Sequence, residues 1–510
     1  MKKSKIIHIV LILAWLLQLA AEAVTLTGIW RLKMVPDGYF ALLTAAFLLL
    51  SALTGLLLFF KQNNPVRRGI ACALIVLILA GCGAGLFVVS KLYDTLHSIT
   101  NQEPEGIAVA VYVRKDDPAQ SLENAGDYTF ASVQNYEQSR TQLVVDEIEA
   151  ALGKSVSVTQ YDSVFTMVDA LYAGDVDAII LNPAYVDILE ENEGYTDYSE
   201  KTRILHVVQT PEKLMPSQPE PTETKGPGET TEPVVPLEIT ERPFVVYLSG
   251  ADNRYKISAT SRSDVNILVV VNPNTHQILL LNTPRDYYVP NPAANGALDK
   301  LTHCGLYGIE NSAQTLSALY GIEIDHYARI NFSGFETLID AVGGITVYSD
   351  ATFKAQNMIV KKGANTFNGE QALHFARERY HVSGGDNGRG KNQMKVITAV
   401  IQKLTASTAL VTNYAGIMDS LKGMFVTDLD VGDIGKLVKM QLEDMPQWEI
   451  FSFAVTGVNG REITYSMPGS RLSVMYVGQE YVDHASSLVK RMLAGDALAD
   501  PDMKLPDPAS

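Results

Sequence analysis

Three apolar stretches open the chain, and each is long enough to cross a membrane as a helix. They cover about residues 7–29, 39–60 and 70–90, and Glu22 is the single acidic residue within them. A helix needs about 20 apolar residues to span a hydrocarbon core of ~30 Å, so the pattern predicts three transmembrane helices in residues 1–100. A cleavable signal peptide is the alternative for the first stretch, but two more stretches follow it without a small-residue cleavage site between them.

Basic residues indicate the orientation of these helices. The connection between the first two stretches holds only Arg31 and Lys33. Six others lie before the first stretch or after the second: Lys2, Lys3, Lys5, Lys61, Arg67 and Arg68. Because cytoplasmic loops are enriched in Lys and Arg, we expect a multi-pass protein of the cell membrane with a cytoplasmic N-terminus. Three crossings then place everything beyond about residue 91 outside the cell.

Residues 105–210 alternate between short apolar runs and runs of helical periodicity. Apolar runs at 106–114, 155–161, 176–183 and 202–210 are separated by amphipathic segments at 139–154 and 163–174. This alternation predicts an exported βαβ accessory domain, which resembles one lobe of a solute-binding-protein fold. No residue cluster in it specifies a ligand, so we favour a structural or interaction role over small-molecule sensing.

Residues 211–242 are rich in Pro, Thr and Glu and lack an apolar period, which predicts a linker. A second exported domain follows at 243–495, with a strand pair within 266–286 around an Asn/Pro turn. Helical periods recur in four later segments: 312–322, 334–344, 369–379 and 391–406. The fold class is therefore α/β, with an α/β/α sandwich in this domain. Residues 496–510 are predicted to be a disordered tail.

Charge and cysteine content narrow the class of protein. The chain is 47% hydrophobic and only 19% charged, and beyond residue 100 it holds 32 of the 41 Lys and Arg against 54 of the 57 Asp and Glu, a net charge of −22. Such an acidic body argues against nucleic-acid binding, although a local basic pocket remains compatible with it. Cys304 is the one cysteine in this part, so no intramolecular disulfide can form there. A bacterial envelope protein fits this pattern best.

Charged residues of the second domain gather where its predicted strands and helices end. They are Asp252, Arg254, Arg262, Asp264, Arg285, Asp286, Lys300, Arg377, Arg379, Asp386 and Arg389. Arginine suits phosphate because its planar, permanently charged fork donates paired hydrogen bonds. Carboxylates beside such an anion need a cation between them, and Mg²⁺ binds through one or two carboxylates plus substrate phosphates. The residue types together suggest metal-assisted phosphoryl transfer, whereas any one of these arginines alone is better explained by a surface ion pair.

Three local features leave alternatives open. Arg377 and Arg379 would diverge by about 200° on a helix, so they need different partners or a helix that ends at the site. His303 and Cys304 could form a nucleophile pair, but a packed, unreactive thiol is the favoured interpretation. The apolar segments 312–322 and 395–405 could line a channel for a prenyl chain or could be ordinary core.

These residues, taken together, resemble the LytR-CpsA-Psr family of envelope phosphotransferases. The resemblance covers about residues 244–405, through the motifs SGADNR, SRSDVNILVVVNPNTHQILLLNTPRDYYV, ALDKLTHCGLYG, FSGFETLIDAVGGITV, FNGEQALHFARER and GGDNGRGKNQ. The three apolar spans and the accessory domain look like the streptococcal capsule-assembly members of the family. One position departs from the common pattern, because Asn392 stands where many members have an arginine before the glutamine.

The resemblance implies a reaction and roles for its residues. A glycan polymer on undecaprenyl pyrophosphate would be transferred, with its sugar-linked phosphate, to a peptidoglycan hydroxyl. Asp252 and Asp264 would hold Mg²⁺ or Mn²⁺, and Asp252 is a candidate base. The pyrophosphate would be bound and its charge stabilised by Arg285, Arg377, Arg379 and Arg389, with a polar contact from Gln393 and supporting roles for Arg254, Arg262, Lys300, Asp286 and Asp386.

Two further functions stay open at this point. The same site could hydrolyse polyprenyl pyrophosphates, with water as the acceptor. Alternatively, the protein could be a non-catalytic envelope sensor or transcriptional attenuator. Under the transferase interpretation we expect a Gram-positive source and four kinds of partner: the lipid-linked glycan donor, the peptidoglycan acceptor, membrane lipid and polymer-synthesis machinery. The transferred polymer could be a capsule, a teichoic acid or another secondary wall polymer.

Overall fold

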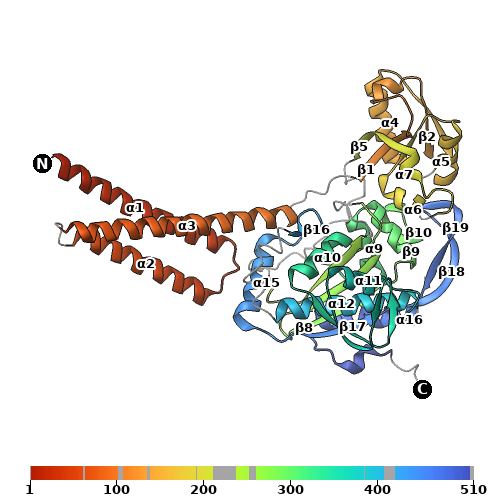
Figure 1. The fold of residues 1–510 in the computed structure, drawn as a ribbon. Helices are drawn as coiled ribbons and strands as arrows, with labels where there is room; N and C mark the ends of the chain where they lie inside the picture. Colours follow the sequence, from red (N-terminus) through yellow and green to blue (C-terminus); the bar gives the residue numbers. More distant parts are fainter. Residues whose placement is uncertain are drawn as a thin grey trace, which may run out of the picture.

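A computed structural model describes residues 2–60, 64–100, 107–134, 138–190, 192–210, 237–251, 260–383, 385–406 and 420–505. A three-helix bundle projects from one side of a globular body, and the accessory domain lies at the other side of that body (Figure 1). The linker at 211–236 falls outside the described residues.

The bundle consists of α1 (Lys2–Arg31), α2 (Asp37–Phe59) and α3 (Pro65–Thr100), three helices long and apolar enough to cross a membrane. Large apolar side chains face outward, as lipid contact requires. Glu22 is buried between α1 and α2, where it accepts hydrogen bonds from Gln18 Nε2 at 2.8 Å and from Ser51 Oγ. The acidic residue of the first span therefore faces helix neighbours and not lipid.

The accessory domain is a mixed five-stranded sheet in the order β3-β2-β4-β1-β5. Its strands are β1 (Ile107–Arg114), β2 (Thr129–Val133), β3 (Ser157–Tyr161), β4 (Ala178–Leu181) and β5 (Thr202–Thr210), and its main helices are α4 (Gln138–Leu152) and α5 (Val164–Ala173). Strand β2 runs parallel to β3 and β4, so the βαβ prediction is right for this half. It is wrong for β1, which runs antiparallel to both β4 and β5.

The second domain is built on a six-stranded sheet in the order β16-β11-β6-β7-β8-β17. The strands are β6 (Phe244–Ala251), β7 (Val265–Asn272), β8 (Gln277–Asn282), β11 (His326–Asn331), β16 (Phe425–Thr427) and β17 (Glu449–Ala454). Helices α9 (Ile309–Tyr320) and α16 (Gln479–Leu493) pack in the core on one face. Helices α10 (Phe332–Ala341), α11 (Gly369–Arg377) and α12 (Asp386–Thr405) cover the other, which confirms the predicted sandwich.

A long hairpin joins the second domain to the accessory domain. Strands β18 (Gly457–Thr464) and β19 (Met467–Val477) extend from the sandwich to the accessory domain (Figure 1). Met467 at the hairpin turn is 1% exposed and lies, with Leu306 and Tyr307, in the core that α5 and β4 build. The core of the accessory domain therefore contains side chains from both predicted domains.

The prediction of a disordered tail is wrong for residues 496–505. Leu498 is buried in the sandwich core, and Arg491 of α16 pairs with Asp502 at 2.9 Å. These long-range contacts are invisible to local composition; residues 506–510 lie outside the described part of the chain. The predicted linker also ends early, because Ile239 is already buried.

Candidate functional site

Asp264 and Arg285 form a buried ion pair at one end of the sheet. Asp264 precedes β7 and Arg285 follows β8, and these strands are antiparallel neighbours, so the two residues meet at the same sheet edge. Arg285 Nη1 donates to Asp264 Oδ1 at 2.8 Å, and Thr302 Oγ1 donates to the same oxygen at 2.9 Å. Burial alone would raise the pKa of Asp264, but the charges of Arg262 and Arg285 outweigh it and hold that pKa well below its usual range.

Each residue of this pair also has one buried polar atom that makes no hydrogen bond to the described residues. Asp264 Oδ2 and Arg285 Nε have no hydrogen-bond partner within the described ranges. A buried carboxylate oxygen without a partner is expensive unless something else binds it. The donor set fits a hard divalent cation, which prefers carboxylate and phosphate oxygens. Within the described part of the chain, no three His, Cys, Asp or Glu residues form a metal cluster.

Two predicted site residues, Asp252 and Arg254, lie outside the described residues. The strand before them ends beside Asp264: β6 ends at Ala251, and Gly250 O accepts a 2.9 Å hydrogen bond from Asp264 N. Arg262, by contrast, is described and buried, and its charge acts on Asp264.

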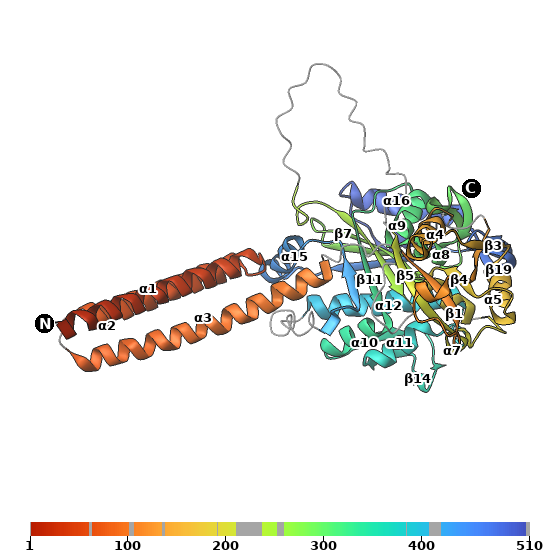
Figure 2. The same ribbon diagram turned by 90° about the horizontal axis from the view of Figure 1, so that it is seen from above.

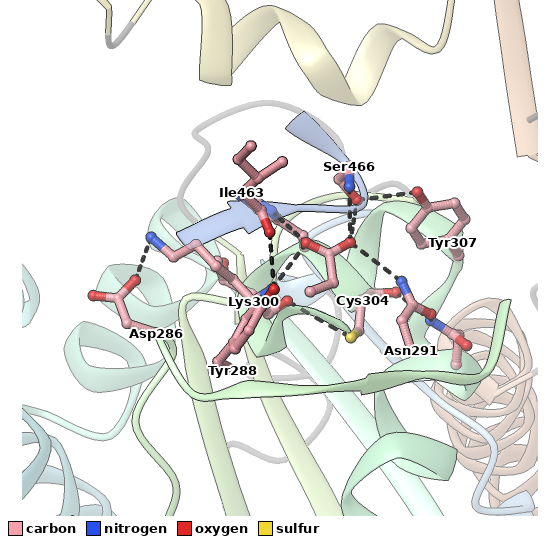
Figure 3. A network of polar contacts seen from close by, with 12 residues as sticks. Asp286, Tyr288, Asn291, Lys300, Cys304, Tyr307, Ile463 and Ser466 are labelled. Carbon is pink, nitrogen blue, oxygen red and sulfur yellow. Dashed lines mark hydrogen bonds and ion pairs between the residues drawn. The ribbon is translucent and has the colours of Figure 1, made fainter. Parts of the chain in front are cut away.

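Lys300 and Asp286 form a second ion pair beside the first. Lys300 Nζ lies 2.5 Å from Asp286 Oδ1, and both side chains are largely buried (Figure 3). Lys300 ends β10 (Ala297–Lys300), and Asp286 follows Arg285 directly. Asp286 O also accepts a 2.7 Å bond from Met475 N of β19, which fixes this loop to the hairpin. The structure thus pairs the two residues with each other, and their expected roles at the site stay predictions.

Arg377 and Arg379 lie where a helix ends, which was one of the two predicted solutions. Helix α11 ends at Arg377, whose guanidinium stacks 4.3 Å from the ring of Phe332. Arg379 lies beyond the helix, where its Nη2 donates to Tyr380 Oη at 2.6 Å. Both arginines are exposed, so they are available to a ligand at the surface.

Arg389 and Gln393 lie on the first turns of α12. Gly390 lets this helix approach β8 closely, because a Cβ there would lie 2.3 Å from Asn282 Nδ2. The contact brings the helix to the strand end that leads into Arg285. The structure does not describe the side chain of Asp386, so its expected role of orienting an arginine stays a prediction.

An apolar pocket opens next to these arginines, between α10, α11, α12 and the sheet. Its lining includes Ile330, Phe332, Phe335, Leu373, Arg377 and Gln393. Two polar residues of the predicted site, Arg377 and Gln393, therefore line an otherwise apolar cavity, which is an arrangement that suits an amphiphilic ligand. Segment 395–405 contributes Ile397, whereas segment 312–322 packs in the core on the opposite face of the sheet.

The family model described as the LytR_cpsA_psr family matches residues 214–477, more than half of the chain. The chain belongs to the LytR-CpsA-Psr family. A curated relative from Enterococcus faecalis, the "Polyisoprenyl-teichoic acid--peptidoglycan teichoic acid transferase TagU", is 36% identical over 39% of this chain and 65% of its own length. A protein of the same name from Oceanobacillus iheyensis is 36% identical over 38% of this chain and 61% of its own. The match spans less than two thirds of either relative.

Among solved structures, the crystal structure of B. subtilis TagV is similar at 22% identity with a TM-score of 0.42, covering 51% of this chain and 99% of that one.

Asn392, where this LytR-CpsA-Psr chain differs from the common pattern of the family, lies in a contact between two helices. Asn392 is buried, and its Nδ2 donates to Phe375 O of α11 at 3.3 Å. Residue 392 thus faces the α11–α12 contact and not the arginines, so the arginine that many members carry would here have to fit into that contact.

Sequence reasoning missed one residue, Arg329 in the middle of β11. It is fully buried, and it donates from Nε to Ser249 Oγ at 3.2 Å and from Nη2 to Ser263 Oγ at 3.0 Å. Burial lowers the pKa of Arg329 to about 10. Since Ser263 precedes Asp264, this arginine supports the loop that carries the site. The available signal was an arginine at an inward position of an apolar strand.

Cys304 is the packed thiol that was predicted. It is fully buried, its Sγ contacts Lys300 O at 3.6 Å, and burial raises its pKa. His303 Nδ1 pairs instead with Asp299 Oδ1 at 2.9 Å, inside a network that Ser466, Asn291 and Lys300 complete (Figure 3). These contacts give His303 and Cys304 structural roles.

Proposed function

We propose that this protein is a membrane-anchored phosphotransferase that moves a glycan polymer, with its phosphate, from undecaprenyl pyrophosphate to peptidoglycan. The observation that carries the proposal is the buried Asp264–Arg285 pair, with one unused atom on each partner. The teichoic acid transferase activity for which the two curated relatives are named supports the same reaction class. It also makes a teichoic acid our first choice of polymer, ahead of a capsule.

The donor fits the site in two parts. Its isoprenoid chain would occupy the apolar pocket lined by Ile330 and Phe335. Its pyrophosphate would lie across Arg285, Arg377 and Arg389, whose forks match phosphoryl oxygens. Arg377 is central to this arrangement because it lines the pocket and ends its helix at the surface. Arg379 would leave its contact with Tyr380 to join the bound phosphate.

Asp264 would hold a divalent cation through Oδ2, together with Asp252. When bound, Mg²⁺ or Mn²⁺ would neutralise pyrophosphate charge. The protein itself positions the reacting groups. An acceptor hydroxyl attacks the phosphorus attached to the sugar, the bond from this phosphorus to the bridging oxygen breaks, and undecaprenyl phosphate leaves. The arginines stabilise the charge on the departing phosphate, and Asp252 is our candidate to take the hydroxyl proton.

A cytoplasmic N-terminus and an extracellular body complete the proposal. The α1–α2 connection contacts α15 (Val431–Asp444) of the catalytic domain through Asp37 and Lys439. A connection that touches the catalytic domain must be on the same side of the membrane as that domain, in agreement with the charge pattern.

The test uses the full-length protein in liposomes with Mg²⁺, a polyprenyl-pyrophosphate oligosaccharide and peptidoglycan fragments. Mass spectrometry should detect a phosphate-linked conjugate with the wild type and none with Arg285→Ala. Arg471→Ala is the matched control, since the side chain of this exposed arginine of β19 contacts only the Arg461 backbone and Glu462 among its recorded hydrogen bonds and ion pairs in the described residues. Released sugar phosphate without conjugate would favour a hydrolase, and donor binding without turnover would favour a sensor.

A further inference from the structure

The extracellular end of the helix bundle is packed against the catalytic domain. Leu32 and Met34 of the α1–α2 connection and Leu96 and Ile99 of α3 are all buried there. Their partners are Phe425 of β16 and, on α15, Val431, Ile434 and Val438. Figure 2 shows α15 lying across this end of the bundle. We call this contact the dock.

Three residues on one face of α15, at successive turns, contact the α1–α2 connection and the first residue of α2. Gly435 has no room for a side chain, because a Cβ there would lie 2.3 Å from Leu32 O. Lys439 Nζ pairs with Asp37 Oδ1 at 2.6 Å, and Glu443 Oε1 accepts from Asp37 N at 2.8 Å. Positions four apart lie on one helix face, so apolar packing, close approach and charge act together. The dock is thus a specific contact and not a loose tether.

The dock and the apolar pocket share a wall. Phe425 packs in the dock and also pairs, in the β11–β16 register, with Ile330, which lines the pocket. The residue before it, Met424, accepts a 3.2 Å hydrogen bond from Asn331 N at the start of α10. Gly334 of α10 approaches Met424 so closely that a Cβ would lie 2.7 Å from Met424 O. One strand therefore separates the membrane bundle from the cavity.

We propose that the dock holds the apolar pocket at the bilayer surface, so that a polyisoprenyl chain enters the pocket from the membrane without crossing water. This inference rests on the proposed function. A chain of many isoprene units is too insoluble to travel through water. A catalytic domain on a free tether would meet the membrane in many orientations, whereas the dock preserves one.

The test compares two donors with the full-length protein in liposomes. One donor carries a long polyprenyl chain inserted in the bilayer, and the other carries a short, water-soluble prenyl chain. Gly435→Leu forces a side chain into the dock, and Gly38→Leu is the matched control because Gly38 has open space around it. We expect Gly435→Leu to lower transfer from the long-chain donor about tenfold, with transfer from the soluble donor unchanged.

A covalent crosslink provides the complementary measurement. Asp37→Cys with Lys439→Cys, joined by a cleavable thiol crosslinker as long as the ion pair that it replaces, should lock the dock and leave long-chain transfer intact, and cleavage should not increase it. The inference is overturned if locking abolishes transfer, or if Gly435→Leu affects both donors equally or neither. Soluble-donor turnover also reports correct folding. Failure of the wild type with both donors would instead reject the proposed function.

Discussion

Arg285 and Asp264 contact each other directly at 2.8 Å, yet each keeps a second buried polar atom without a partner in the described structure. A pair that only stabilised the fold would use those atoms, because leaving them unsatisfied costs roughly 1–3 kcal/mol each. We therefore propose that the pair receives an anion on the arginine side and a cation on the aspartate side.

Replacing the carboxylate tests the cation side. Asp264→Asn keeps the size and the contact with Thr302 but removes the charge, so we expect turnover to fall by about 10²-fold or more and its dependence on Mg²⁺ to flatten. The measurement is conjugate formation across a Mg²⁺ titration. Glu480→Gln on the surface of α16 is the control. An unchanged Mg²⁺ response in Asp264→Asn would contradict a cation role for this residue.

The buried arginine of β11 should act on the site indirectly. Arg329→Met removes the hydrogen bonds to Ser249 and Ser263, so we expect a loss of roughly 2–4 kcal/mol in the free energy of unfolding. Because Ser263 adjoins Asp264, the concentration of Mg²⁺ needed for half-maximal turnover should also rise. Denaturant titration and the Mg²⁺ titration together check this. If stability falls while the Mg²⁺ requirement stays constant, the role of Arg329 is purely structural.

His326 makes stability depend on pH near neutrality. The carboxylate of Asp428, whose Oδ1 lies 3.6 Å from His326 Nδ1, raises the pKa of His326. The contribution of this pair to stability is therefore complete below the unfolded value of about 6.5 and disappears as the pH rises through the folded value. We expect the melting temperature to fall by about 1–3 °C from pH 6 to pH 8, as a contribution of at most about 1 kcal/mol implies. His326→Gln should remove that part of the slope, and an unchanged slope would assign it to other groups.

The shared core should couple the accessory domain to the second domain. Met467→Ala leaves a cavity between the hairpin and α5, so we expect a cost of about 2–5 kcal/mol. Calorimetry should show a single unfolding transition for the wild type and should shift that transition as a whole in Met467→Ala. Two transitions in the wild type, with only one affected, would show that the domains unfold independently.

Much of the architecture could be predicted because local patterns carry it. The three apolar spans, the β7–β8 pair and helices α9 to α12 follow from periodicity alone, and the ordered motifs indicated the family. Periodicity shows which face of an element is buried but not which element covers it. The antiparallel direction of β1, the packing of Leu498 and the insertion of Met467 all depend on contacts between distant segments, and for that reason they were missed.

The same limit applies to the site. Residue chemistry singled out Asp264, Arg285 and Arg377, and the structure places the first two in contact and the third at an apolar pocket. It could not show that Asn392 faces α11, that Arg379 contacts Tyr380, or that Arg329 supports Ser263, because each depends on the orientation of a side chain in the folded state. Asp252 and Arg254 stay predictions.

The insertion of Met467, Leu306 and Tyr307 into the accessory core also constrains how such a protein can be taken apart or recombined. A boundary drawn at the Pro-rich segment would look natural from composition, yet either half expressed alone would expose apolar surface that normally belongs to the other. Exchange of the accessory domain with that of a relative would succeed only if the β18–β19 hairpin travelled with it. The two domains therefore behave as one structural unit whenever this protein is divided or recombined.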